Sequence, residues 1–391
     1  MQANALDRAQ LFIDQDRWID AERELKLYLG QEPEDPDAHR MLALCLLQTN
    51  RRKEGLFEAQ KAVALEPDNP WAHYVVAYAH QVLRKYKKAE EAISEALRRD
   101  PEEPDFYALL SGLQAIQAKP RQSLETAEAG LSIDPTHEEC LNLRAQALSI
   151  LGRSHEAIAS GHEALAQNPV SDSTHTHLGW ANLRGGQRES ALQHLKEALR
   201  LNPNDEYARE GLLEALRTGF WPYRMIFTAY GYVHRLPRQL QWLPGIALWL
   251  IFRTSARFLR QNPSYTPVLA PFVFVIGAFY FLYFVGRPLA NITLLFTPLG
   301  RLALGPTQRR ETWVSFAFLA AGLVLLLIDG VSALQTGAGG AFFLLAFLLM
   351  GLPNGRCSSE RTQSILFWSV AVVFGLLASL VTVGGLIDRP E

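Results

Sequence analysis

The chain has 391 residues, of which 48 % are hydrophobic, and its formal net charge is −2. This length allows two or three domains. The three cysteines, Cys45, Cys140 and Cys357, are too few and too scattered for a disulfide framework or a zinc site, and they predict a reducing compartment.

The near-neutral total hides two halves of opposite charge. Residues 1–214 carry 24 basic and 35 acidic side chains, a net of −11, whereas residues 215–391 carry 14 and 5, a net of +9. The acidic half argues against nucleic-acid binding. The second half has no lysine and no acid between Glu214 and Glu311, a composition typical of sequence held against anionic lipid.

A proline returns at one constant interval throughout the first half. A fixed period of ~20 to 50 residues marks an architecture of stacked repeats. Because proline cannot donate to a helical ladder and restrains the residue before it, each one predicts the end of a helix. The six prolines in register are Pro33, Pro67, Pro101, Pro135, Pro169 and Pro203.

Small residues recur at two further positions of each repeat. Such residues are needed where two helices cross closely. Between them, apolar side chains fall at helical spacing, as in the segment AEEAISEALRRD, so each repeat is predicted to be two helices joined by a turn. One set is Ala9, Ala43, Ala77, Ser111, Ala145 and Gly179; the other is Ala21, Gly55, Ala89, Ser123, Ala157 and Ala191.

This pattern, with its proline interval, resembles the tetratricopeptide repeat (TPR), a helix pair of about 34 residues. The sixth unit, HLGWANLRGGQRESALQHLKEALRLNP, fits best, and the resemblance covers residues 1 to about 217. The sequence departs from the family at Pro120, in the turn of the fourth unit, and at the first-helix tryptophan position. That position holds His39, His73, Tyr107, Leu141 and His175.

The resemblance implies a superhelix with a concave groove, lined by the first helix of each pair, that binds peptides or partner helices. An amphipathic helix after Pro203, DEYAREGLLEALRTG, is expected to cap the stack. The outward register includes Asp105 and Glu139. As groove residues we predict Trp71, Tyr74, Tyr78, Arg40, Asn142 and Trp180.

Trp71, Tyr74 and Tyr78 share one helical face, and large aromatics are common anchors at binding surfaces. The alternative is that they pack against the neighbouring repeat. The groove lacks the lysine and asparagine set with which chaperone-binding relatives hold a carboxylate, which disfavours recognition of a chaperone tail.

Residues 218–263 mix aromatics with arginines, a composition that suits the headgroup layer of a membrane. The apolar run 243–252 is too short to span a bilayer, so we expect an interfacial amphipathic helix, with a half-inserted segment as the alternative. The predicted interface anchors are Arg253, Arg257, Arg260, Trp242 and Trp249.

Residues 264–391 contain four apolar segments, and the predicted fold class is therefore all-α: a superhelix of six helix pairs followed by a transmembrane bundle of about four spans. Arginine-rich loops on both sides of the first span leave two alternatives, an extra crossing at 240–252 or a partial dip at 287–306. The predicted spans are 265–286, 313–334, 337–353 and 365–387.

No phosphate-cradling loop, serine nucleophile elbow or zinc motif is present in the sequence, so no enzyme activity, cofactor or metal is expected. We expect a multi-pass membrane protein whose cytosolic repeats bind protein partners, with basic partners favoured by the acidic repeat half. The alternative is a regulatory repeat domain on a transporter or an intramembrane enzyme subunit. Its candidate charged groups are Asp329, Arg301 and Arg287, for which anchoring at span ends is the simpler interpretation.

Overall fold

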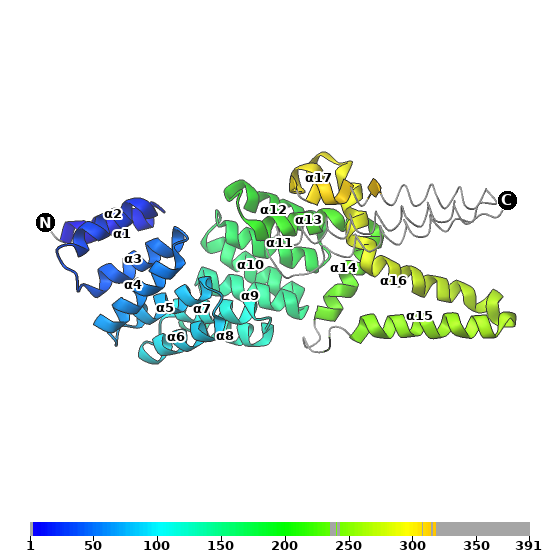
Figure 1. Ribbon diagram of the computed structural model, residues 1–391, viewed down its shortest axis with the longest axis horizontal. Coiled ribbons are helices and arrows are strands. Elements are labelled where there is room, and N and C mark those ends of the chain that lie inside the picture. The colour runs from blue at the N-terminus through cyan, green and yellow to red at the C-terminus, as the bar shows by residue number, and fades with distance from the viewer. Residues whose placement is uncertain (1–2, 235–239, 241–242, 307, 314–315, 318–391) are drawn as a thin grey trace, which may run out of the picture. The chain divides into compact units, whose positions relative to one another are not determined.

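The computed structural model describes residues 3–234, 240, 243–306, 308–313 and 316–317, and its elements there are helical (Figure 1). The chain divides into two compact units, Met1–Gly185 and Gly186–Glu391. The first unit therefore ends inside the sixth predicted repeat.

The first unit is built from helix pairs, one pair to each repeat. The two helices of a pair contact each other, and the second contacts the first helix of the next pair. The helices are α1 (Ala3–Asp14), α2 (Trp18–Leu29), α3 (Pro36–Gln48), α4 (Arg52–Leu65), α5 (Pro70–Val82), α6 (Tyr86–Arg99), α7 (Pro104–Ile116), α8 (Pro120–Ile133), α9 (Glu138–Leu151), α10 (Ser154–Gln167) and α11 (Asp172–Arg184).

The first helices of the pairs also form a row of their own: α1, α3, α5, α7, α9 and α11 each contact the next. The predicted stack of helical repeats is therefore confirmed for this unit. The fourth repeat, where Pro120 departs from the family, is regular. Pro120 occupies the first turn of α8, where backbone N–H groups have no acceptor within the helix, so a proline breaks no hydrogen bond there.

The repeating prolines stop the second helices, as predicted. From α4 onward, each second helix ends two residues before its proline. The residue directly before the proline is extended, with ψ between 81° and 101°, because the proline ring excludes helical geometry there. These residues are Glu66, Asp100, Asp134, Asn168 and Asn202.

The proline carbonyl is a second fixed point of the repeat. It accepts a hydrogen bond from the side chain six residues later, which explains most departures from tryptophan at the first-helix position. The donors are His39 (2.9 Å), His73 (2.8 Å), Tyr107 (3.0 Å), His175 (3.4 Å) and, in the second unit, Arg209 (2.8 Å). Since a carbonyl can only accept, each histidine donates to it through Nε2. These histidines are structural.

The turns inside the pairs repeat with the same period, through one residue with positive φ. In the first unit the residue is Asp16, Asn50, Arg84 and Ala118 in turn, with φ from 57° to 64°, and then Gly152 with φ 84°. Left-handed backbone costs an L-residue about 1–2 kcal/mol and glycine nothing. The fifth turn therefore has an unstrained glycine at this position, whereas Arg84 and Ala118 are strained.

Small side chains occupy the helix crossings. Ala43 is fully buried, and a Cβ on Gly55 would lie 2.8 Å from Leu47 Cγ and 3.1 Å from the Ala43 carbonyl oxygen. In the fourth pair, Ser111 donates its hydroxyl to the Ser123 carbonyl at 2.8 Å, so its polarity is satisfied inside the crossing.

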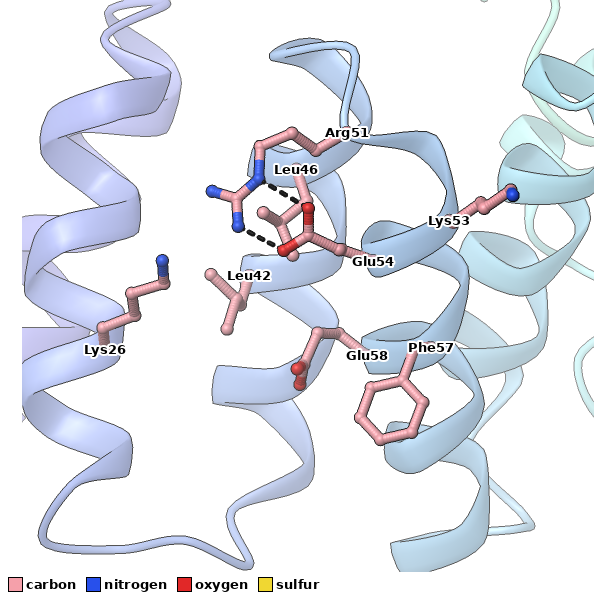
Figure 2. A pocket seen from close by; sticks show the side chains of 8 residues that line it. All are labelled: Lys26, Leu42, Leu46, Arg51, Lys53, Glu54, Phe57 and Glu58. Atoms are coloured by element: carbon pink, nitrogen blue, oxygen red, sulfur yellow. Dashed lines mark hydrogen bonds and ion pairs between the residues drawn. The ribbon is translucent and has the colours of Figure 1, made fainter.

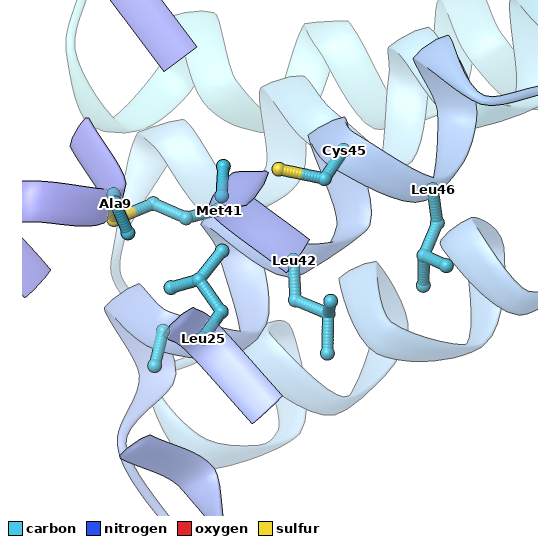
Figure 3. Packing of buried hydrophobic residues seen from close by; sticks show 8 residues of the cluster. Ala9, Leu25, Met41, Leu42, Cys45 and Leu46 are labelled. Atoms are coloured by element: carbon cyan, nitrogen blue, oxygen red, sulfur yellow. The ribbon is translucent and has the colours of Figure 1, made fainter. Parts of the chain in front are cut away.

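Apolar clusters fill the space between pairs. Figure 3 shows the first of them, in which Leu25, Met41, Leu42 and Leu46 pack together from α2 and α3.

We expect Gly152→Ala to lower the free energy of unfolding by about 1 kcal/mol, because the added Cβ is strained at positive φ. The matched control is Gly112→Ala in α7, where the backbone is helical and the nearest atom to the new Cβ is 3.9 Å away. That variant should gain up to about 1 kcal/mol. Urea unfolding followed by circular dichroism measures both free energies of unfolding. Equal effects of the two substitutions would contradict the left-handed conformation of Gly152.

The second unit begins with α12 (Arg188–Leu201) and α13 (Glu206–Arg217), the expected capping helix. Its later elements are α14 (Trp221–His234), α15 (Leu243–Gln261), the 3-10 helix η2 (Pro263–Tyr265), α16 (Thr266–Leu295) and α17 (Pro298–Ala303). α13 contacts α12, α16 and α17. It differs from the polar-faced cap that the sequence suggested, because its outer face is covered by these elements.

A buried polar network fixes that cover. Glu214 and Arg217 of α13 are 6 % and 3 % exposed and form an ion pair at 2.8 Å. Tyr223 of α14 donates its hydroxyl to the same carboxylate, and Arg217 Nε donates to Asn291 Oδ1 of α16 at 2.7 Å. One carboxylate and one guanidinium thus connect three helices.

We expect Arg217→Ala to destabilise this packing by roughly 3–5 kcal/mol, because the Glu214 carboxylate would stay buried without its cation. The double variant Glu214→Leu/Arg217→Met removes both charges and should cost far less. Hydrogen exchange of the α13 and α14 amides in the full chain measures the stability of this packing in both variants. Unchanged protection in Arg217→Ala would contradict a role of the network in packing.

The structure gives no support to the span expected at 265–286. In the part of the chain that it describes, no helix combines the length and the apolar character that crossing a membrane requires. α16 does not end at Arg287 as expected but continues to Leu295, and Ala290, Leu294 and Leu295 are buried. The other predicted spans, from residue 318 onward, lie outside the described residues, and so does Asp329.

Candidate functional site

The row of first helices carries most of the predicted groove residues. α5 begins where the Asn69 side chain accepts the Trp71 N–H at 3.0 Å and Pro70 fixes the first turn. This start presents Trp71, Tyr74 and Tyr78 at helical spacing, and all three are half-buried.

The aromatic side chains of α5 reach the next repeat. Trp71 and Tyr74 lie with ring centroids 5.1 and 5.7 Å from that of Phe106 on α7, and 5.3 Å from each other. Phe106 is fully buried and was not singled out from the sequence. Part of each ring thus packs in the core between repeats, as the alternative interpretation held, and part remains accessible.

Tyr78 lies closer to the preceding repeat. Its hydroxyl accepts a hydrogen bond from Gln48 Nε2 at 3.3 Å. Burial raises the pKa of both Tyr74 and Tyr78, so both phenols are neutral donors at physiological pH.

Two carboxylates from the following first helices act electrostatically on Tyr74. Asp105 of α7 and Glu139 of α9 are close enough to Tyr74 to raise its pKa further. Asp105 accepts a hydrogen bond from His137 Nε2 at 3.1 Å, while His137 Nδ1 accepts the Cys140 N–H and caps α9. We call the surface made by Tyr74, Tyr78, Asp105 and Glu139 the α5–α7–α9 face.

Glu139 is the titratable centre of this face. Its side chain reaches solvent, but the surrounding helices desolvate it and, together with the Glu138 charge, raise its pKa to about 7. Neither Asp105 nor Glu139 is paired with a lysine or arginine of the described chain, but Asp105 is paired with His137, and this contact raises the pKa of His137 to about 10. The α5–α7–α9 face therefore offers two carboxylates near aromatic rings, one of them already paired with a histidine.

Asn142 lies next to Glu139 and fully inside the protein. It is 0 % exposed, and neither its amide nitrogen nor its amide oxygen has a hydrogen-bond partner of good geometry in the described structure. Buried amides without partners are rare, since each costs about 1–3 kcal/mol. Asn142 is therefore behind the α5–α7–α9 face and is not one of its exposed contacts.

The remaining predicted groove residues lie elsewhere. Arg40 of α3 donates to Asp37 through Nε (3.1 Å) and Nη2 (3.0 Å). Trp180 of α11 is 7 % exposed, and the Arg184 guanidinium lies 5.1 Å from the centroid of its ring. The structure does not bring these two residues to the α5–α7–α9 face.

The predicted interface anchors fall on α15 as far as they are described. Arg253 and Arg257 are exposed on that helix. The side chains of Trp249 and Arg260, and the whole of Trp242, lie outside the described residues. Of the charged candidates for transport, Arg301 donates to the Leu295 carbonyl, which fixes the turn before α17, and the side chain of Arg287 is outside the described set.

A cavity of about 320 Å³ opens between α2, α3 and α4, and nothing in the sequence indicated it. Figure 2 shows the Arg51 and Glu54 side chains paired across its rim, with Leu42 and Leu46 on its wall and Phe57 at one side. Of the other charged side chains on its lining, Lys26 pairs with Glu22 and Glu58 with His39. In the described chain no three His, Cys, Asp or Glu side chains gather as metal ligands.

Paired helices in a row, with an aromatic and acidic face on the first helices, define a helical repeat protein. Two family models of the tetratricopeptide repeat match the chain, one over residues 46–113 and the other over residues 6–70 and 142–206. The amino-terminal part of this protein therefore consists of tetratricopeptide repeats, as the proline period predicted.

A solved structure agrees on the fold of this part. The Cut9–Hcn1 hetero-tetramer of the APC/C is 15 % identical and gives a TM-score of 0.50, over 55 % of this chain and 43 % of that chain. Two further solved structures are similar. Pseudomonas aeruginosa PilF is 17 % identical with a TM-score of 0.44, over 54 % and 95 %. YrrB, a TPR protein with an unusual peptide-binding site, is 21 % identical with a TM-score of 0.35, over 48 % and 96 %. No curated protein sequence matches the chain.

Substitution of the aromatic side chains tests which of them pack in the core between repeats. We expect Trp71→Ala to cost about 2 kcal/mol of stability, because it removes two edge contacts and half-buried area. Tyr78→Phe, which deletes only the hydroxyl that accepts from Gln48, should cost less than about 0.5 kcal/mol. Thermal unfolding followed by circular dichroism compares them, and an unchanged melting temperature in Trp71→Ala would show that the ring is not part of the core.

Proposed function

We propose that this protein is a scaffold that binds a basic, extended segment of a partner polypeptide on the α5–α7–α9 face. The observation that carries the proposal is the pair of carboxylates, Asp105 and Glu139, whose charges act on Tyr74 and of which only Asp105 has an ion-pair partner, His137, in the described chain. A lysine or arginine side chain of the partner would add a cation beside Glu139.

The aromatic rings suit the same occupant. A cation over a tyrosine or tryptophan ring gains about 0.5–1 kcal/mol at an exposed site and more when water is excluded. The Trp71 and Tyr74 rings are held in place by Phe106, so little side-chain freedom is lost when a partner binds. The face is therefore preorganised for a cationic side chain.

Long-range charge supports the same chemistry. Residues 1–214 carry a net charge of −11, which raises the encounter rate with a basic partner and lowers it with an acidic one. This steering is screened by salt, since the Debye length is about 8 Å at physiological ionic strength. Binding should therefore weaken as salt is added.

The direct test compares three extended peptides of one length that differ only in charge: one with lysine and arginine, one with glutamine in their place, and one with glutamate. Calorimetric titration against the full chain should rank them in that order. If none of the three binds, the scaffold proposal itself fails. If the acidic peptide binds best, the α5–α7–α9 face is not the site.

Glu139 makes the binding dependent on pH. Its carboxyl has a pKa of about 7 and the partner lysine one of about 10, so lowering the pH from 8 to 6 neutralises the acid while the lysine stays charged. We expect affinity for the basic peptide to fall roughly two- to fivefold over this interval, the range of an exposed ion pair worth about 0.5–1 kcal/mol.

Glu139→Gln should bind at pH 8 as weakly as the natural protein binds at pH 6, and its affinity should no longer change with pH. The matched control is Glu125→Gln on α8, an exposed carboxylate of a second helix, which should retain both affinity and pH dependence. The same pH dependence in all three proteins would exclude Glu139 as the contact.

We propose a membrane surface as the place where partners are held, with the repeats on the cytosolic side. What supports this is the sequence of 313–334, 337–353 and 365–387, three apolar segments in which Asp329 is the one acidic residue and most of which lie outside the described residues. Alkaline extraction of membranes, followed by protease protection of the repeats, tests it. Release of the full chain by alkaline carbonate would contradict the proposal.

A further inference from the structure

The helices α15 and α16 form a hairpin whose outer surface is apolar. They contact each other, and η2 joins them in a bend (Figure 1). In this bend the rings of Phe258 and Tyr265 lie 5.9 Å apart. The carboxyl-terminal part of α16 contacts α13, α14 and α17, so the hairpin is attached to a packed base.

Large apolar side chains lie exposed along one stripe of each helix of the hairpin. Leu243, Ile246 and Leu250 recur at spacings of three and four residues and share one face of α15, next to Ile251, and the α16 residues recur in the same way. Their exposed fractions run from 41 to 66 %. The residues are Leu243, Ile246, Leu250 and Ile251 on α15, and Val268, Phe272 and Val275 on α16.

An exposed apolar surface of this extent marks a site of contact with a protein or a membrane. The charge of the hairpin decides between them. Arg253 and Arg257 are exposed at the carboxyl-terminal end of the α15 stripe, and the sequence holds no acid from residue 215 to residue 310. A partner protein would need acidic groups to match; an anionic lipid layer offers phosphate charge and apolar interior together.

The polar groups within the stripe do not oppose insertion. The Thr254 hydroxyl donates to the Leu250 carbonyl of its own helix at 2.7 Å, so it needs no water. Arginine side chains can extend to the headgroups while their methylene stems stay in the apolar layer.

We propose that the α15–α16 hairpin is a lipid-binding element that places the Val268, Phe272 and Val275 stripe in the apolar layer of an anionic bilayer, with Arg253 and Arg257 at the phosphates. This contact is separate from the protein-binding α5–α7–α9 face. It assigns a lipid as ligand to a segment of the chain that lies outside the repeats.

The test uses an environment-sensitive fluorophore on Phe272→Cys in the full chain, mixed with vesicles of phosphatidylcholine alone or with phosphatidylglycerol. Phe57→Cys on α4 is the matched control, since Phe57 is 63 % exposed against 66 % for Phe272. With phosphatidylglycerol present, we expect a probe at 272 to shift to the blue and to be quenched several-fold more by lipid-attached nitroxide than by iodide. The probe at 57 should show the reverse.

Replacement of both arginines, Arg253→Gln/Arg257→Gln, should reduce the lipid quenching at 272 several-fold with phosphatidylglycerol and leave the weak signal with phosphatidylcholine unchanged. Three results would overturn the proposal. Iodide quenching at 272 would show that water covers the stripe. A blue shift without lipid quenching would show that another segment of the chain covers it, and self-quenching between labelled chains would show that a second copy does.

Discussion

The close crossing of two helices within each repeat is the contact on which the rest of the structure depends. At Gly55 there is no room for a methyl group, and at Ser111 a hydroxyl fits only because Ser123 accepts it. Small residues let the backbones approach, and this distance determines where the next pair can pack. Because the same crossing returns in every repeat, one local constraint produces an extended stack.

The stack, in turn, brings together side chains that are far apart in sequence. Tyr74, Asp105 and Glu139 belong to three successive repeats, yet they share one electrostatic environment because α5, α7 and α9 lie in a row. The α5–α7–α9 face therefore arises from stacking, because its side chains come from three different repeats.

The second unit uses a different means of packing. α13 ends in a buried ion pair whose carboxylate accepts the Tyr223 hydroxyl and whose guanidinium donates to Asn291. A buried pair of this kind adds little to stability, but it specifies which groups must meet, since any other packing would leave a charge without a partner. A buried ion pair thus holds the helices at the base of the hairpin together, while the outer surface of the hairpin consists of apolar side chains.

The sequence alone determined the repeat, because its period, its prolines and its small residues act within one helix pair. The residue before each proline is extended and the turn residue is left-handed for reasons that need no tertiary contact. It also placed Trp71, Tyr74 and Tyr78 on one helix face. Only the tertiary structure decided that Phe106 holds two of these rings, and that Asn142 and Trp180 are buried.

Helical register gives the direction of a side chain but not what the neighbouring helix covers. The same limit applied to α13 and α16. Their apolar patterns predicted a terminal cap and a span ending at Arg287. Hydropathy describes single segments, so it could not predict the hydrogen bond between Arg217 and Asn291, which are 74 residues apart in the chain. Contacts between residues so far apart depend on how the helices pack.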